Sequence, residues 1–304
     1  MTGRMRAIPP HIRTSRRTAG VMGDVCIALV PPSVAAVYFF GWDAAIRLVV
    51  AVATCGAAAA VTDRRRGEAP DLCAPVTGLI VALSCPVQIP LWLLVLLCLA
   101  AIWLVRELFG GVGKNLFNPA MASRALLLTV FPAYAGGFSL PDASSGATPL
   151  AEGGAASVPQ LWSLFWGHVN GSMGETSALM ILLGMGYLLI RRVIRLRTPL
   201  GVLAGFSAVM LVTGQPVVTH LLSGSILFGA VYIFTDYAGR PTTDSGEWLY
   251  AIGAGVLTAL LRAYGTYPEG VCFAALLMNL LSPLIEQLTM PRVYGYGKRR
   301  RKTQ

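Results

Sequence analysis

Long apolar runs, separated by short polar or Gly- and Pro-rich breaks, fill most of the chain. A helix needs roughly 20 apolar residues to cross a bilayer, and the runs approach that length. The pattern predicts ten membrane-spanning helices, at about 23–40, 44–61, 72–85, 90–105, 118–134, 176–190, 199–213, 217–234, 247–263 and 269–286. Charged residues make up 12% of the 304 residues, whereas soluble domains carry about 25%. We therefore predict an all-α polytopic membrane protein.

The basic residues lie between the apolar runs, and their distribution predicts an orientation. The formal net charge of +10 would suggest a nucleic-acid partner for a soluble protein. With the N-terminus in the cytoplasm, every Lys and Arg except Arg47 and Arg262 falls on the cytoplasmic side, in agreement with the positive-inside rule. We predict an N-in, C-in protein without a nucleic-acid partner. It has cytoplasmic basic tails at 1–22 and 291–304, and a single membrane domain at 23–290 with an external loop at about 135–175.

Some of the predicted helices are short or interrupted. The 72–85 run stops before Pro86, and broken helices are tolerated only where protein or a cavity satisfies the freed backbone groups. Ten crossings divide into two sets of five with opposite orientation, and 77–83 resembles 223–228. A five-plus-five inverted repeat is one interpretation, and chance similarity of Gly/Ala/Leu-rich helices is the other. Because transporters use this architecture, a solute channel or transporter is an alternative function. A cofactor-free scaffold subunit is another.

Residues that hold metals or haem are sparse. The three histidines, His11, His168 and His220, include no pair within the apolar runs, which argues against a bis-histidine haem. The six cysteines are scattered and form no C-x-x-C pair, whereas iron–sulfur clusters need closely grouped thiolates. We therefore predict no metal site, and no catalytic residue that acts without a cofactor or partner.

The external loop carries a small-residue sequence with a specific pattern. Asp142-Ala143-Ser144-Ser145-Gly146-Ala147-Thr148 fits D-x-x-[ST]-G-A-[ST], which resembles the recognition sequence of flavin transferases. Those enzymes esterify the last hydroxyl with the phosphate of FMN. Pro149 biases Thr148 away from helix, so its hydroxyl is expected to be accessible. The hypothesis is FMN on Thr148, with Asp142, Ser145, Gly146 and Ala147 forming the attachment motif; an ordinary loop turn is the alternative.

A glycine-rich segment precedes the 118–134 run. Gly110-Gly111-Val112-Gly113-Lys114 is not a P-loop, because Leu108 stands where glycine is required and Asn115 where Ser or Thr is required. Pro119 suits the first turn of a helix, and Asn118 is a good cap for it. Two amides beside a glycine-rich approach can also hydrogen-bond a planar heterocycle or line an ion path.

Together these motifs resemble the RnfD/NqrB family. The sequence G-G-x-G-K-N-x-F-N-P-A is followed by S-G-A-T-P-L, and Phe234-Thr235-Asp236 and Tyr267-Pro268-Glu269-Gly270 match the family in the second half. The similarity covers nearly all of 20–290. Chain length and the short N-terminal tail favour the RnfD branch, which belongs to the Rnf complex. The family often has M-x-T-D-P where this chain has Ile233-Phe234-Thr235-Asp236-Tyr237, and at this segment the chain departs from the family pattern.

The resemblance implies a function and partners. It implies a subunit of an ion-translocating ferredoxin:NAD oxidoreductase in a bacterial inner membrane, assembled with the A, B, C, E and G subunits and matured by a flavin transferase. It also implies FMN on Thr148 and electron flow coupled to Na⁺ or H⁺ translocation. Some relatives hold a noncovalent riboflavin, and Asn115, Asn118 and Arg124 match family positions near it.

Ionisable residues near the ends of the apolar runs are candidates for an ion path, because charges at membrane depth are costly. The candidates are Glu107, Asp236 and Glu269. For Glu107 the alternative is an interfacial ion pair with a neighbour such as Arg106.

Overall fold

The structure is a computed structural model of the full chain, and it describes residues 18–67, 72–111, 113–135, 158–167, 171–223, 225–265 and 270–291. Every regular element in these ranges is helical, which confirms the all-α class. The elements are α1 (Thr18–Phe40), α2 (Trp42–Arg66), α3 (Cys73–Ser84), α4 (Leu91–Leu99), η1 (Ala100–Glu107), α5 (Pro119–Val130), α6 (Pro132–Ala135), α7 (Val158–Trp166), α8 (Ala178–Ile190), α9 (Arg197–Val212), α10 (Val217–Leu222), α11 (Ile226–Phe228), η2 (Gly229–Ile233), α12 (Asp244–Tyr264) and α13 (Val271–Thr289).

Among the described residues, α1, α2 and α13 are each long and apolar enough to cross a membrane. The shorter apolar helices α3, α5, α8 and α9 coincide with predicted runs. Two π-helical segments, η1 and η2, continue α4 and α11. Such segments are rare and are often found at functional sites. The count of ten crossings stays a prediction.

The structure differs from the sequence prediction at three places. The 217–234 run is broken, because the backbone at Ser223 is extended between α10 and α11. The 118–134 run is also divided, since Phe131 leaves the helical conformation before Pro132. Finally, the loop predicted at 135–175 contains the helix α7, whose stretch from Leu161 to Trp166 is mostly apolar.

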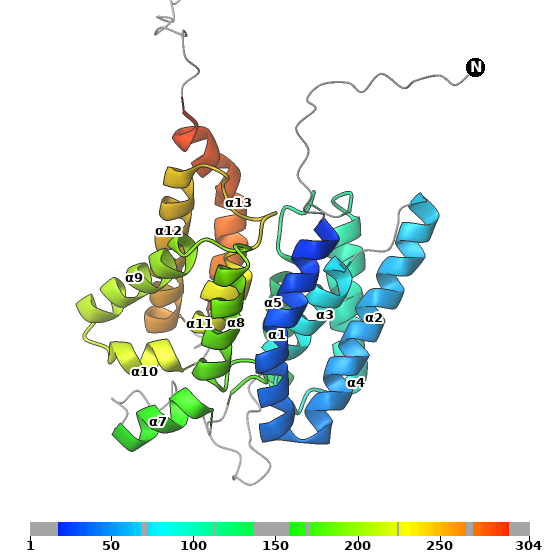
Figure 1. Ribbon diagram of the computed structural model, residues 1–304, viewed down its shortest axis with the longest axis horizontal. Coiled ribbons are helices and arrows are strands. Elements are labelled where there is room, and N and C mark those ends of the chain that lie inside the picture. Colours follow the sequence, from blue (N-terminus) through cyan, green and yellow to red (C-terminus); the bar gives the residue numbers. More distant parts are fainter. Residues whose placement is uncertain are drawn as a thin grey trace, which may run out of the picture.

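The helices form two groups, which we call the N-terminal half (α1–α5) and the C-terminal half (α8–α13). Figure 1 shows them side by side, with α7 at one end of the bundle. The halves meet where α1 packs against α8 and α5 against α13. Asp24 of α1 accepts hydrogen bonds from Tyr187 Oη (3.0 Å) and Arg191 Nε (3.1 Å) of the α8 region. Each half therefore contributes its first and last helix to the contact.

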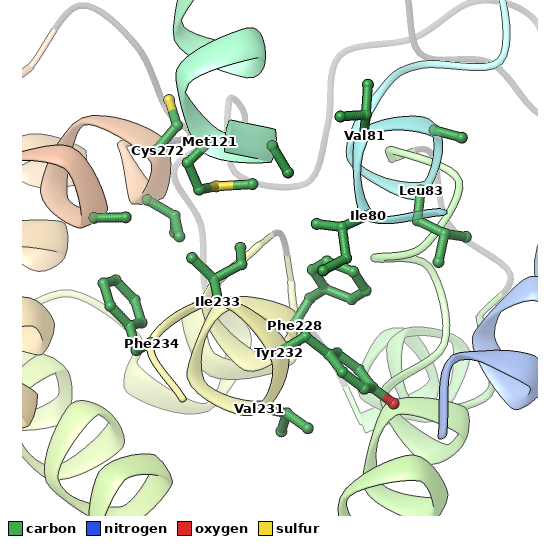
Figure 2. Packing of buried hydrophobic residues seen from close by; sticks show 14 of the residues in the cluster. Ile80, Val81, Leu83, Met121, Phe228, Val231, Tyr232, Ile233, Phe234 and Cys272 are labelled. Carbon is green, nitrogen blue, oxygen red and sulfur yellow. The ribbon is translucent and has the colours of Figure 1, made fainter. Parts of the chain in front are cut away.

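Apolar side chains from both halves fill the space between them. Figure 2 shows Ile80 and Leu83 of α3, Met121 of α5, and Phe228 and Tyr232 of the α11–η2 segment in one buried cluster. Tyr232 Oη also donates a hydrogen bond to the main-chain oxygen of Ala28 at 2.7 Å. The π-helical segment is thereby fixed against α1.

Small residues set the closest helix contact, between α9 and α12. A Cβ added to Gly255 would lie 2.1 Å from Val202 O, and one added to Gly205 would lie 2.5 Å from Ile252 O. Close backbone approach through small residues is how membrane helices gain packing energy, since lipid is as apolar as their side chains. This contact holds α12 in place beside the segment that follows η2.

Candidate functional site

A cavity of about 390 Å³ lies between the two halves. Ligand pockets in proteins measure roughly 300–1,000 Å³, so this space is of ligand size. The N-terminal half supplies residues of α1, of α3, of the end of η1 and of the start of α5. The C-terminal half supplies residues of the end of α8, of η2 and of the segment after it. The lining is mostly apolar, with a few polar groups at defined places.

Asn118 is the first of these polar groups, and its position follows from its role as helix cap. Its Oδ1 accepts from the main-chain N–H groups of Ala120 (3.0 Å) and Met121 (3.3 Å), and Pro119 occupies the first helical position. The amide nitrogen is then directed away from the helix, where it donates to Asp236 Oδ2 at 3.1 Å. The predicted cap is confirmed, and the same side chain joins the two halves at the cavity.

Asp236 lies three residues after the end of η2 and faces Asn118. Its Oδ1 accepts from the main-chain N–H of Ala238 at 3.4 Å. Burial raises the pKa of the Asp236 carboxyl above its ordinary value, and the N–H donors of Ala238 and Asn118 oppose that rise. A buried carboxyl whose neutral form is favoured by burial is therefore part of the cavity wall.

Asn279 of α13 supports this arrangement. With its amide oriented so that both ends are satisfied, its oxygen accepts from the main-chain N–H of Asn118 at 2.9 Å. In the same orientation its nitrogen donates to Tyr250 Oη at 3.0 Å and to Gly239 O at 3.2 Å. The start of α5 is thus held by α13, and the segment after η2 is held by the same amide.

Asn115 lines the cavity from the glycine-rich approach to α5. Gly110, Gly111 and Gly113 have φ angles of 104°, 96° and 76°, which residues with a side chain rarely adopt. These turns bring Asn115 to the cavity wall. Its Oδ1 is buried and accepts no hydrogen bond within the described part of the chain. An acceptor in that position fits a ligand that presents an N–H group.

Two of the ion-path candidates differ in their surroundings. Glu107 pairs with Arg66 at 2.8 Å and lies 3.6 Å from Arg106 Nε, so its carboxylate belongs to a cluster of charges at the end of η1. Arg106 lines the cavity and pairs with Asp63 of α2 at 3.2 Å, with both side chains at most 5% exposed. Only Asp236, of these acids, reaches the cavity together with the two asparagines.

Arg124 has other partners and is not among the cavity-lining residues. It donates to the main-chain oxygen of Ser84, to Glu175 Oε1 at 2.9 Å and to Ser172 Oγ at 3.2 Å. The sequence prediction singled out neither Glu175 nor Ser172. A lone carboxylate directly before an apolar run, as in Gly174-Glu175-Thr176, was the available signal. Thr148 with Asp142, Ser145, Gly146 and Ala147, and also Glu269, lie outside the described residues.

Fold and site define a helical membrane protein whose two halves enclose a ligand-sized cavity lined by paired amide and carboxyl groups. Comparison with known proteins gives the family: residues 5–295 match the NQR2, RnfD, RnfE family, and the chain belongs to it. The resemblance inferred from the motifs is thereby confirmed.

Several similar proteins have names that state their role, and each is the D subunit of its complex. One belongs to the Na(+)-translocating ferredoxin:NAD(+) oxidoreductase complex of Acetobacterium woodii, and it is 38% identical over 95% of this chain and 94% of the relative. A second belongs to the ion-translocating oxidoreductase complex of Stutzerimonas stutzeri, at 36% over 92% of each. A third belongs to the proton-translocating ferredoxin:NAD(+) oxidoreductase complex of Clostridium ljungdahlii, at 32% over 94% of each.

Proposed function

We propose that this protein is the D subunit of an Rnf-type, ion-translocating ferredoxin:NAD oxidoreductase complex. It would relay electrons within the membrane while the complex moves Na⁺ or H⁺, and it would catalyse nothing alone. The observation that carries the proposal is the cavity at the seam of the two halves, where Asn115, Asn118 and Asp236 converge. Relatives that match over more than nine-tenths of the chain bear that subunit name.

We propose that a noncovalent flavin of the riboflavin type binds in this cavity. The apolar lining from α1, α3 and η2 suits a planar aromatic ring. Asn115 Oδ1 offers an acceptor for a ring N–H group, and the Asp236–Asn118 pair offers a carboxyl and an amide beside it. The flavin would supply the redox chemistry, while the chain holds it and excludes water. Asp236 would exchange a proton at the cavity wall.

The second proposed cofactor is FMN, linked through its phosphate to Thr148 by a partner flavin transferase. This rests on the motif and on the family. The experiment is a denaturing gel of the protein made together with its flavin transferase, viewed under ultraviolet light. Fluorescence in the band should disappear in Thr148→Ala and persist in Ser145→Ala. A dark wild-type band would refute the covalent flavin and favour the transporter or scaffold alternative.

The proposed topology places the Thr148 loop outside the cytoplasm. It rests on the distribution of basic residues; exposed large aromatic residues mark the helix ends that reach an interface, because they are enriched at both interfaces. The ends of α1 and α6 and the starts of α2 and α4 expose Tyr38, Tyr134, Trp42 and Trp92. Those helix ends are the external ones in the N-in arrangement. A Trp42→Cys variant should be labelled by an impermeant thiol reagent on intact cells, and protection there would refute the orientation.

We also propose that the two halves are inverted repeats of five helices each. In such a repeat the first helices and the fifth helices of the two halves are equivalent, and these are the pairs that meet, α1 with α8 and α5 with α13. The third element of each half is short or broken: α3 ends after 12 residues, and the α10–α11 region is broken at Ser223. Binding sites of such proteins lie at the repeat interface, as the cavity does.

A further inference from the structure

A buried arginine occupies the broken end of α3. The helix stops at Ser84 inside the bundle, and the main-chain oxygen of Ser84 accepts a hydrogen bond from Arg124 of α5. Arg124 also binds the carboxylate of Glu175 at 2.9 Å, and the two side chains are 6% and 1% exposed. Ser172 Oγ accepts a further bond from the same guanidinium at 3.2 Å.

The chain before α8 is bound directly to this helix end. Gly174 N–H donates to Leu83 O at 2.7 Å, and Met173 N–H donates to Cys85 O at 3.2 Å. A Cβ on residue 174 would lie 2.6 Å from Leu83 Cβ, so glycine is required for the approach. The last carbonyls of a helix carry partial negative charge, and Glu175 adds a full one. This point therefore has a negative potential that a cation must balance.

The break in the C-terminal half has the same feature. Arg262 of α12 donates to the main-chain oxygen of His220 at 2.7 Å and to that of Ser223 at 3.4 Å, at the end of α10. Its guanidinium lies over the ring of Phe206, 5.1 Å from the centroid. Two short helices, α3 in one half and α10 in the other, thus each end on a buried guanidinium, although the arginines come from different helices.

We propose that Arg124 and Arg262 are resident cations that exclude mobile cations from the two helix breaks. In many membrane transporters the carbonyls of broken helices bind the coupling ion. Here a guanidinium, which stays protonated in proteins, takes the place that such an ion would fill. While a guanidinium holds these helix-end carbonyls, a mobile cation cannot use them to pass outside the coupled path, which makes the two arginines specificity-determining residues. The inference rests on the proposed function only in that the complex sustains an ion gradient.

The experiment measures passive leak in proteoliposomes that contain the assembled complex without electron donor or acceptor. A Na⁺ gradient or a pH gradient is imposed, and its decay is followed with entrapped fluorescent indicators. Arg124→Met removes the charge and keeps the apolar volume, and it should raise the leak about tenfold, which corresponds to about 1.4 kcal/mol off the barrier. Arg124→Lys keeps a cation and should leave the leak at the wild-type rate. Arg195→Met, which removes a surface arginine whose side chain is 57% exposed, is the control for charge loss.

Arg262→Met is the second test, because the contacts described for Arg262 are to two main-chain oxygens and an aromatic ring, whereas Arg124→Met removes the ion-pair partner of Glu175. It should also raise the leak. Wild-type leak in an assembled Arg262→Met complex overturns the proposal, as does a leak in Arg124→Lys equal to that in Arg124→Met. The leak measurement requires no flavin, so a complex with Thr148→Ala should leak at the wild-type rate. A failure of the flavin proposal is thereby distinguishable from a failure of this one.

Discussion

The bond between Asn118 and Asp236 gives the sharpest test of the cavity. Asn118→Ala removes two interactions, the cap of α5 and the amide donor to the Asp236 carboxyl. Loss of a helix cap costs about 1 kcal/mol. Leaving a buried acceptor without its donor costs about 1–3 kcal/mol. We therefore expect Asn118→Ala to destabilise the protein by about 3 kcal/mol, and to lower its content of noncovalent flavin.

A matched variant separates the contribution of the helix cap from that of the hydrogen bond to Asp236. Asn118→Ser retains an oxygen that caps the helix but cannot reach Asp236 with an N–H donor, so its loss should be about 2 kcal/mol, the hydrogen-bond term alone. The assay is the melting temperature of the purified protein in detergent, with flavin released by acid measured on the same samples. Melting temperature and flavin content should both fall in the order wild type, Asn118→Ser, Asn118→Ala. A Ser variant that melts with the wild type and keeps its noncovalent flavin would show that the Asn118–Asp236 bond contributes nothing, and would refute our account of the site.

Three further predictions follow from the described contacts. Asp236 has a raised pKa, so the stability contributed by its neutral carboxyl is present below its ordinary pKa of 3.8 and is lost as pH rises through the raised value. When the melting temperature is measured from about pH 4 to pH 8, it should therefore fall less for Asp236→Asn than for the wild type. An equal fall of the two melting temperatures with pH would contradict this. Arg106→Met should cost about 3–5 kcal/mol because it strands the buried Asp63 carboxylate, and the double variant Arg106→Met/Asp63→Leu should recover most of that loss in the same melting assay. Gly255→Val should prevent α12 from packing on Val202 and abolish accumulation in the membrane, measured by immunoblot, whereas Gly20→Val, at a position with open space, should accumulate normally.

The hydrophobic pattern predicted where most helices lie, because a membrane environment selects an apolar composition, but it did not predict that two of the runs are divided. The start of α5 was also predictable, since Asn118 and Pro119 are local signals for a helix N-terminus. The break at Ser223 falls at Ser223-Gly224-Ser225, a polar, Gly-containing interruption that the apolar residues on both sides outweighed in the hydrophobic pattern. The helix α7 was missed because the loop around it is rich in Gly, Ala and Ser, which obscured its short apolar stretch.

The site was predictable in its members but not in its geometry. Asn115, Asn118 and Asp236 were candidates for separate reasons, and no local signal places Asp236 against a residue 118 positions earlier in the chain. Arg124 was a candidate for flavin contact on family grounds, but its partners in the structure are Ser84, Ser172 and Glu175. Tertiary contacts of this kind depend on how the halves meet, and the pattern along one chain does not contain that information.

The location of the cavity between the N-terminal and C-terminal halves has a mechanical consequence. If one half rocks against the other as a rigid body, the walls supplied by the start of α5 and by the segment after η2 must move apart or slide. A ligand in contact with both walls would resist that displacement, and a change in its charge or shape would alter the resistance. Occupancy of this one space would then set the mobility of the whole bundle.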